Sequence, residues 1–562
     1  MDKKRQSLCD LFAIIFIGLL ASLPLVFKGI DGMIYQDLQF HLSRIEGVKE
    51  GLLSGQFPVM MQSVWMSGKG YPVSIFYGDA PLYIPAILRI MGVKVIPAYK
   101  IFVLLVNILT ATSAVISFKR IVKDDIAAYV GALLYVTASY RYVDIYVRAA
   151  AGEYVSFIFF PIIALAMYRI LFDDEEKNDL FENSFLLALG MTGLIESHIL
   201  STVMTVFLLT LICIFFAKRT FKKKSILTIG AAVLETVMIN LYFIVPFIDY
   251  YINEPVYAGR GGDHTQAMLI RSSGAYLSQF VDFFGQIFGR NIEYKELRMQ
   301  LTIGLPLTIA LIACLVVFLI KQRKYPYFVI GFMSMLTLFM STDRFPWNTL
   351  EGRTHLFKIL AKVQFPWRYL AAAILFTSLI AALMLKEAAK SKTAIMIAAV
   401  SLCIVMTVVF AVKYKQGYES VNFKEYLEVD SGYMGACEYL KEGSELEVIE
   451  YVPTNPQLES YEVKSLKDNK IVMYVSNPGE ESYVEVPKVN YKGYYAYDEN
   501  KNPLTIRNGY LNLIDVVVPA GFEGEITVNF KQPFYWIIST VISFVSLAFL
   551  CFTAVKRKGT AN

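Results

Sequence analysis

The chain has 562 residues, of which 56% are hydrophobic and 18% charged, and its mean hydropathy is +0.48. This composition is too apolar for an ordinary soluble multidomain protein and predicts a polytopic membrane protein. The net charge of +5 does not point to a nucleic-acid partner, because the basic residues lie in short loops between apolar runs, where the positive-inside rule puts them.

The apolar runs predict about twelve transmembrane helices, since a bilayer crossing needs roughly 20 residues. The first run is too long for the apolar core of a cleavable signal peptide, so we expect a retained helix. The runs at 126–140 and 183–196 are short for a full crossing. The expected ranges are roughly 8–27, 99–118, 126–140, 155–171, 183–196, 199–217, 226–248, 301–320, 326–341, 368–386, 393–413 and 534–554.

Clusters of Lys and Arg orient these helices in the membrane. With the clusters on the cytoplasmic side, both termini are cytoplasmic and the remaining loops face outward. Only the acidic loop 172–182 lacks a basic cluster, and acidic residues weigh little in this rule. The clusters are Lys3-Lys4-Arg5, Lys119-Arg120, Lys218-Arg219, Lys222 to Lys224, Lys321 to Lys324, Lys386 to Lys392 and Lys556-Arg557-Lys558.

Two long loops lie on the predicted outer face. In the first, 28–98, the segment 38–53 spaces Leu38, Leu42, Ile45, Val48 and Leu52 three and four residues apart. This spacing predicts an amphipathic helix suited to the membrane interface. Residues 81–92 predict a second such helix or a shallow span. The second loop, 249–300, has glycines at 259–262, which suit either a mobile gate or a plain linker.

Residues 415–532 differ in character from the rest of the chain. Short β-rich runs at 448–451, 470–475, 483–486 and 516–518 are separated by Asn-Pro, Gly and Asp. We therefore expect an extracytoplasmic all-β domain here. The predicted organisation is a transmembrane domain at 1–414 with the long first loop 28–98, the β domain at 415–532, and a final helix with a basic cytoplasmic tail at 533–562.

The common soluble-enzyme motifs are absent from the sequence. It has no P-loop or dinucleotide glycine motif, no HExxH and no GxSxG. It also lacks DxD and CxxC, so a divalent metal is left open and no cofactor is certain. Cys437 is the one cysteine of the predicted outer domain, which predicts no structural disulfide there.

The titratable groups of this chain gather on the predicted outer face. All four histidines, His41, His198, His264 and His355, fall on that side. Asp37 follows the first helix and precedes His41 by four residues, one helical turn. A carboxylate held there could remove a proton from an acceptor hydroxyl. The alternative is a helix-capping Asp beside an interfacial His.

A short loop between two predicted spans concentrates Asp144, Arg148 and Glu153. Its arginines could bind phosphate, and its carboxylates could orient a sugar or a metal. An interfacial salt-bridge cluster is an equal alternative. Glu196-Ser-His198 interrupts another apolar stretch and marks either a functional site or an outer turn.

Glu235 and Asn240 favour a different function. Both lie within one apolar run, where an acid could relay protons or form a hydrogen bond between helices. They point toward transport.

Several short motifs resemble the GT-C superfamily of membrane glycosyltransferases, and in particular the bacterial YfhO-like and "6-pyruvoyl-tetrahydropterin synthase-related" membrane proteins. The resemblance spans nearly the whole chain, and Gln364-Phe-Pro-Trp-Arg368 is its most distinctive motif. The pterin-synthase label does not carry over, because the four histidines are far apart and form no HxH pair. The other motifs are Asp37 to Arg44, Gly55-Gln-Phe-Pro58, Gly68-Lys-Gly-Tyr-Pro72, Arg148 with Gly152-Glu153, Glu196-Ser-His198, and Gly493-Tyr-Tyr-Ala496 to Pro519-Ala-Gly521.

The resemblance implies transfer of a sugar from a polyprenyl-phosphate-linked donor to a cell-envelope glycan, lipid or protein on the outer face. By this analogy Asp37 and Glu153 are the catalytic carboxylates. The implied substrate-binding residues are His41, Arg44, Arg148, Glu196, His198 and Arg368. Two alternatives are a lipid-linked-sugar flippase that depends on Glu235, and a non-catalytic envelope-assembly protein that depends on the β domain. No internal repeat of the transporter kind is visible in the sequence.

Overall fold

A computed structural model describes residues 3–27, 37–173, 179–257, 273–283, 299–320, 325–351, 353–388, 391–415, 438–444, 458 and 460–560. The chain forms two compact units, each built from three separate stretches of sequence. Unit 1 comprises Met1–Leu38, Tyr99–Thr236 and Asp263–Val421. Unit 2 comprises Gln39–Ala98, Val237–Gly262 and Asn422–Asn562.

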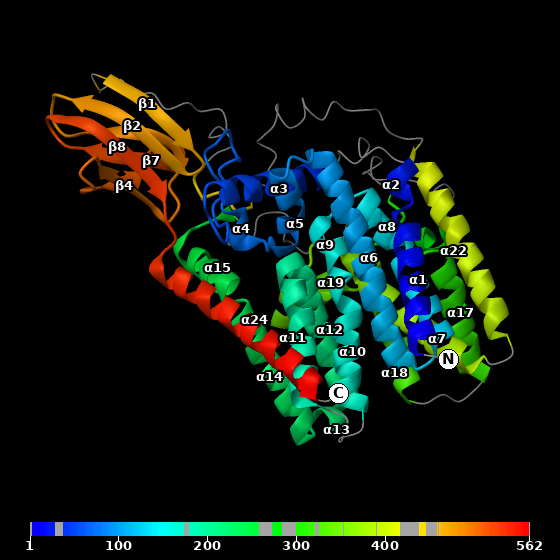
Figure 1. The fold of residues 1–562 in the computed structure, drawn as a ribbon. Helices are drawn as coiled ribbons and strands as arrows, with labels where there is room; N and C mark the ends of the chain where they lie inside the picture. The colour runs from blue at the N-terminus through cyan, green and yellow to red at the C-terminus, as the bar shows by residue number, and fades with distance from the viewer. Residues whose placement is uncertain are drawn as a thin grey trace. The chain divides into compact units, whose positions relative to one another are not determined.

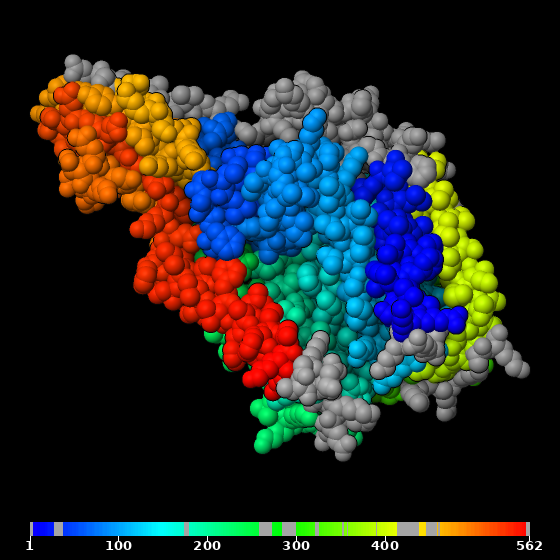
Figure 2. Space-filling view, viewed as in Figure 1, coloured from blue at the N-terminus to red at the C-terminus, as the bar shows by residue number. Residues whose placement is uncertain are grey.

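Unit 1 is helical (Figure 1). At its centre, α21 is buried along most of its length and packs against α7, α17 and α18. On the surface, α1 lies beside α22 (Figure 2). The helices are α1 (Lys3–Ser22), α2 (Pro24–Phe27), α6 (Val95–Val122), α7 (Asp125–Val136), α8 (Ser139–Tyr146), α9 (Ala151–Ser156), α10 (Phe159–Phe172), α11 (Leu180–Ser197), α12 (Ile199–Phe215), α13 (Ala217–Thr220), α14 (Lys223–Ile239), α17 (Leu305–Ile320), α18 (Tyr325–Met340), α19 (Trp347–Glu351), α20 (His355–Ala361), α21 (Tyr369–Glu387) and α22 (Lys392–Lys415), with 3-10 turns η5 (Leu277–Val281) and η6 (Pro366–Arg368).

Within the described ranges, six helical segments are long and apolar enough to cross a membrane. A seventh is counted if α14 and α15 (Leu241–Asn253) form one bent span. Other apolar helices, among them α7, α12, α17 and α18, have only 10–17 residues. The chain is therefore compatible with a multi-pass membrane protein, while the expected number of about twelve spans exceeds the six found by length. The six are Lys4–Ser22, Val95–Val122, Ala151–Phe172, Pro366–Glu387, Lys392–Val412 and Phe534–Arg557.

Among the predicted helices that are divided in the structure, two are broken at residues whose backbone angles leave the helical region. The expected helix 126–140 ends at Val136, and α8 begins only after Ala138, whose backbone is extended with ψ 140°. The expected helix 226–248 breaks at Asn240, with φ −101° and ψ 10°. Asn favours helix ends over helix interiors because its side chain competes for backbone hydrogen bonds. Because the apolar periodicity continues across both breaks, the sequence does not predict either of them.

The helical part of unit 2 includes the amphipathic helix predicted at 38–53, which is confirmed as α3 (Leu38–Leu53). Leu42, Ile45 and Val48 are completely buried, and Leu52 is partly buried. The segment predicted at 81–92 forms η2 (Ala80–Leu82) and α5 (Tyr83–Ile90). The other helices are α4 (Val73–Phe76), α15 and α24 (Phe534–Thr560), with 3-10 turn η8 (Tyr510–Asn512).

The C-terminal β domain contains two antiparallel sheets that share one apolar core. One sheet has the order β1-β2-β8-β4-β5 and the other β3-β7-β6. Along β2, buried and less buried residues alternate, as expected for a strand with one face on the core. The runs predicted at 470–475, 483–486 and 516–518 are confirmed, whereas 448–451 lies outside the described residues. The strands are β1 (Ser460–Lys467), β2 (Lys470–Asn477), β3 (Ser482–Val489), β4 (Tyr494–Asp498), β5 (Pro503–Leu504), β6 (Ile506–Asn508), β7 (Leu513–Val518) and β8 (Phe522–Phe530).

The first long loop shares a hydrophobic core with the β domain. Trp65 and Tyr71 from the loop pack in one cluster with Tyr491 from the β domain and Trp536 from α24. The buried Lys488 of β3 adds hydrogen bonds from Nζ to the carbonyl oxygens of Gly68 at 2.6 Å and Asp468 at 2.8 Å. The sequence-based boundaries place 28–98 with the transmembrane domain, whereas the structure groups 39–98 with the β domain and α24.

Candidate functional site

The candidate site lies in unit 1 and is centred on Arg148, which follows α8. Its Nη1 donates to Asp144 Oδ1 at 2.8 Å and to Glu153 Oε2 at 2.7 Å. Asp144 lies one helical turn before Arg148, and Glu153 lies in the first turn of α9. Both carboxylates are almost completely buried, with 0% and 1% of their side-chain surfaces exposed. The loop between two short helices thus folds back on itself around a single guanidinium.

A second arginine reaches the same carboxylate from a distant part of the chain. Arg368 ends the turn η6, and its Nε donates to Glu153 Oε2 at 3.1 Å. Its Nη1 is held by the Val363 carbonyl at 2.7 Å and by Gln364 Oε1 at 2.9 Å. The Tyr140 hydroxyl donates to Glu153 Oε1. Glu153 therefore joins α8, α9 and η6, and the Gln364-Phe-Pro-Trp-Arg368 motif places its arginine in the site.

Asp37 is the accessible carboxylate of this cluster. Its backbone N–H donates to the Arg148 carbonyl at 3.0 Å, which fixes the chain at this point. Its Oδ2 lies 3.9 Å from Arg148 Nη2, at the outer limit of an ion pair. The Asp37 side chain is 45% exposed. The Asp37 carboxylate is therefore partly open at the surface, whereas Asp144 and Glu153 are covered.

Burial raises the pKa of two acids in the site, Asp37 and Asp144. It raises the pKa of Asp37, against the opposing charges of Arg148 and Arg368. Although part of the Asp37 side chain is open, protein surrounds it closely enough to disfavour the ionised form. Burial also raises the pKa of Asp144 well above its ordinary value, and the charge of Glu153 adds to that shift. Glu153 is thus the carboxylate best placed to balance the two arginines.

Glu196 and His198 lie at the junction of α11 and α12. The His198 ring caps α12, with Nδ1 accepting from the Ser201 backbone N–H at 3.3 Å and lying 2.8 Å from Ser201 Oγ. Both Glu196 and His198 are buried. His198 is near enough to Glu153 to act electrostatically on its carboxylate. The structure therefore associates His198 with the cluster and also gives it a structural role at the helix start.

The other two predicted substrate-binding residues, His41 and Arg44, belong to α3 in unit 2. Arg44 is buried and donates to Asp79 Oδ1, at 3.0 Å from Nε, and to the Gly78 carbonyl at 2.7 Å from Nη2. Its guanidinium lies 3.9 Å from the Tyr77 ring centroid, and His41 Nδ1 is 3.3 Å from Nη1. These contacts give Arg44 a structural function within unit 2, where it holds the loop at 77–79 against α3.

Sequence reasoning missed two partners of the site. Tyr140 holds Glu153, and Gln364 holds Arg368. A single Tyr among many aromatic residues gives no signal of such a contact. Gln364 does carry a signal, because it opens the motif that ends at Arg368 and lies four residues before it. Its backbone takes a left-handed conformation, with φ 68°, which turns the chain just before η6.

The described residues hold no group of three or more His, Cys, Asp or Glu side chains that could bind a metal ion. The cluster offers different chemistry. A partly open carboxylate can accept a proton, and the two guanidiniums beside it, although almost completely buried, place positive charge near an anionic group at that opening. Their positions are set by Glu153, so the positive charge is oriented before any substrate arrives.

No family model matches the chain. It is similar to an uncharacterized protein of Lactococcus lactis subsp. cremoris, at 22% identity over 604 residues that cover 97% of this chain and 95% of the relative. The two chains are thus similar over nearly their full lengths.

Proposed function

We propose that this chain is a membrane glycosyltransferase of the GT-C type that transfers a sugar from a polyprenyl-phosphate donor to a cell-envelope acceptor. The observation that carries the proposal is the half-exposed Asp37 beside the buried Arg148–Glu153–Arg368 network. The helices that compose this unit are apolar, which suits a lipid-linked donor.

In this proposal Asp37 accepts the proton of the acceptor hydroxyl. The acceptor oxygen then bonds to the anomeric carbon while the bond from that carbon to the phosphate oxygen breaks, and the lipid phosphate leaves with the electron pair. Arg148 and Arg368 stabilise the negative charge that develops on the leaving phosphate. Glu153 orients both arginines, and His198 acts electrostatically on the Glu153 carboxylate.

The orientation belongs to the same proposal. About twelve crossings place both termini in the cytoplasm, and the Asp37 cluster and the β domain lie outside. The support is the distribution of basic clusters, which follows the positive-inside rule. An outer-face site implies that the acceptor is a glycan, lipid or protein of the cell envelope.

The test compares glycan transfer to envelope acceptors in membranes that carry matched amounts of wild type or Asp37→Asn. Asp125→Asn is the control, because Asp125 also lies in unit 1, is 46% exposed and pairs with a cation, Lys119, at 3.2 Å. We expect Asp37→Asn to abolish transfer and to accumulate lipid-linked sugar, and Asp125→Asn to retain activity. Full transfer by Asp37→Asn would refute the assignment of the base.

One observation favours a transporter as the second candidate. Glu235 of α14 accepts a hydrogen bond from Ser184 Oγ at 2.9 Å on Oε1, while its buried Oε2 has no hydrogen-bond partner among the described residues. An acid held in this way could carry a proton or bind a cargo group. If Glu235→Gln stops function while Asp37→Asn does not, the protein belongs to the transporter class.

A further inference from the structure

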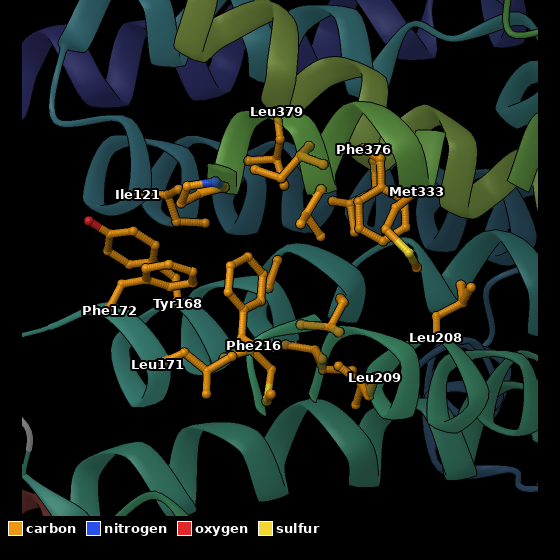
Figure 3. Close-up of a pocket in the computed structure, with 18 of the residues that line it drawn as sticks. Ile121, Tyr168, Leu171, Phe172, Leu208, Leu209, Phe216, Met333, Phe376 and Leu379 are labelled. Carbon is orange, nitrogen blue, oxygen red and sulfur yellow. The ribbon is translucent and has the colours of Figure 1, made fainter. Parts of the chain in front are cut away.

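A cavity of about 440 Å³ lies within unit 1, away from the Asp37 cluster. Helices α10, α12, α18 and α21 supply most of its wall, and side chains such as Leu208, Met333 and Phe376 point into it (Figure 3). The volume falls within the range of about 300–1,000 Å³ that is typical of small-molecule sites. The wall is overwhelmingly apolar, so an occupant must be largely hydrocarbon.

The cavity is elongated along the helices that form it. On α10 the lining runs from Phe160 to Phe172, and along α12 and the residue that follows it from Met204 to Phe216. Twelve helical residues rise about 18 Å, whereas one leaflet of a bilayer contributes roughly 15 Å of hydrocarbon. The length therefore matches one extended acyl chain.

Three exposed cations line one end of the cavity, namely Lys123, Arg219 and Lys386. Arg219 Nη1 donates to the Leu171 carbonyl at 3.0 Å, and Lys386 Nζ donates to the Val122 carbonyl at 2.8 Å. The guanidinium of Arg219 also lies 4.6 Å from the Phe172 ring centroid. The positive groups are thus held at the ends of the helices whose apolar side chains form the wall.

This cationic end lies at the opposite ends of the helices from the candidate active site. Helix α12 begins after His198 and α21 after Arg368, whereas Arg219 follows the end of α12 and Lys386 lies in the last turn of α21. The nearby carboxylate of Asp124 is engaged by Lys392 at 2.5 Å. Apolar depth with a basic rim is the pattern expected of a lipid site whose headgroup end lies away from the candidate active site.

We propose that this cavity binds an anionic glycerophospholipid, with one acyl chain between α10, α12, α18 and α21 and the phosphate at Lys123, Arg219 and Lys386. The site is separate from the proposed transfer reaction and requires only that these apolar helices lie in a bilayer. A lipid bound in this way fills a space between four helices and stabilises the folded unit by mass action.

The test uses the purified full-length chain in detergent. Its melting temperature is measured after addition of phosphatidylglycerol, of phosphatidylcholine with the same acyl chains, or of glycerol phosphate. We expect phosphatidylglycerol to raise the melting temperature by several degrees and the other two to have clearly smaller effects. An equal effect of phosphatidylcholine or glycerol phosphate would overturn the proposal.

Two pairs of variants locate the effect in the cavity. Ala164→Trp fills the cavity from α10, whereas Val206→Trp adds the same side chain on α12 at a residue that is 49% exposed and outside the lining. The rim is tested by Lys123→Gln with Arg219→Gln, against Lys556→Gln with Arg557→Gln in α24. Ala164→Trp and the double variant at Lys123 and Arg219 should lose most of the phosphatidylglycerol shift. Val206→Trp and the double variant at Lys556 and Arg557 should retain it.

The two arms keep the result decisive. If Ala164→Trp does not fold, the two double variants still test the site. A full phosphatidylglycerol shift in the double variant at Lys123 and Arg219, equal to that of the control at Lys556 and Arg557, would overturn the proposal. Asp37→Asn should show the wild-type lipid shift, because Asp37 does not line the cavity. If the wild-type chain transfers glycan but shows no melting-temperature shift with phosphatidylglycerol, the lipid-site inference fails while the proposed enzyme activity stands.

Discussion

At the scale of single residues, Glu153 has the most demanding position in the candidate site. Its carboxylate accepts hydrogen bonds from Arg148, Arg368 and Tyr140, and its side chain is 1% exposed. Charges removed from water in this way are costly unless each is matched. The Glu153 carboxylate therefore serves both the fold and the orientation of the two arginines, whereas the more exposed Asp37 can serve function alone.

We predict that Glu153→Gln strongly destabilises the chain, because it leaves two buried guanidiniums without their shared negative charge. Loss of one partner of a buried ion pair typically costs about 3–5 kcal/mol. Asp144→Asn is the matched control. Among the described residues Asp144 accepts from Arg148 alone, whereas Glu153 accepts from both arginines, so this variant should lose less stability. Thermal melts of the solubilised proteins give the comparison, and equal losses in both variants would contradict it.

We also predict the pH dependence of transfer. A general base works only when it is deprotonated, and burial raises the pKa of Asp37 above its ordinary value of 3.8. The rate should therefore rise with pH through a value above that of a free aspartate, and level off once Asp37 is ionised. A pH–rate profile of wild type beside Asp125→Asn measures this limb. A limb at the ordinary aspartate pKa would argue against Asp37 as the base.

Part of the site could be predicted from the sequence. Arg148 and Glu153 are close in sequence and carry charge between apolar runs, so their proximity follows from local spacing. Arg368 was found through its motif. The contacts of Arg44 could not be predicted, because its partner Asp79 lies 35 residues away and only the fold of unit 2 brings the two together.

At the scale of elements, hydrophobic periodicity predicted the type and approximate position of α3 and of the β strands. It did not predict where helices are interrupted. The face of α3 was predicted from five apolar residues, and the β runs from alternation and turn residues. The interruptions at Ala138 and Asn240 were missed, because both lie in continuous apolar sequence. Average hydropathy depends on composition, whereas a break depends on a few backbone angles.

The buried Lys488 of β3 gives a prediction at this scale. Burial lowers its pKa to about 8, whereas an unfolded chain keeps the proton up to about 10.4. Below pH 8 both states are protonated and the penalty of burying the charge is complete. As pH rises from 8 toward 10.4, the unfolded state binds more protons, so stability should increase, by about 3 kcal/mol at 1.36 kcal/mol per pKa unit.

The measurement is denaturant unfolding at pH 7.5 and 10 in a background with Trp347→Phe and Trp367→Phe. Fluorescence then reports Trp65 and Trp536, which are both buried in unit 2. Lys488→Met should lose the rise in stability with pH, and Lys464→Met, at a more exposed strand residue, should keep it. An unchanged pH dependence in Lys488→Met would show that another group titrates.

At the scale of the whole molecule, chain order and spatial grouping differ. Unit 2 collects 39–98, 237–262 and 422–562, although a reading along the sequence assigns these to loops, a span and a separate domain. Its core joins the Trp65 region, Tyr250 of α15 and Trp536 of α24. No local pattern signals such long-range packing. A soluble-looking β domain and a long first loop thus form one folded body.

This grouping leads to a prediction about topology. If unit 2 carries the first loop and the β domain on the outer side, Glu481→Cys in the β domain should react with a membrane-impermeant maleimide on intact cells. Lys222→Cys, in a basic cluster between α12 and α14, should react only after permeabilisation. Both changes are made in a chain whose six cysteines are replaced by Ser, and both positions are exposed. Labelling of Lys222→Cys alone on intact cells would invert the orientation and place the Asp37 cluster in the cytoplasm, where an envelope acceptor is out of reach.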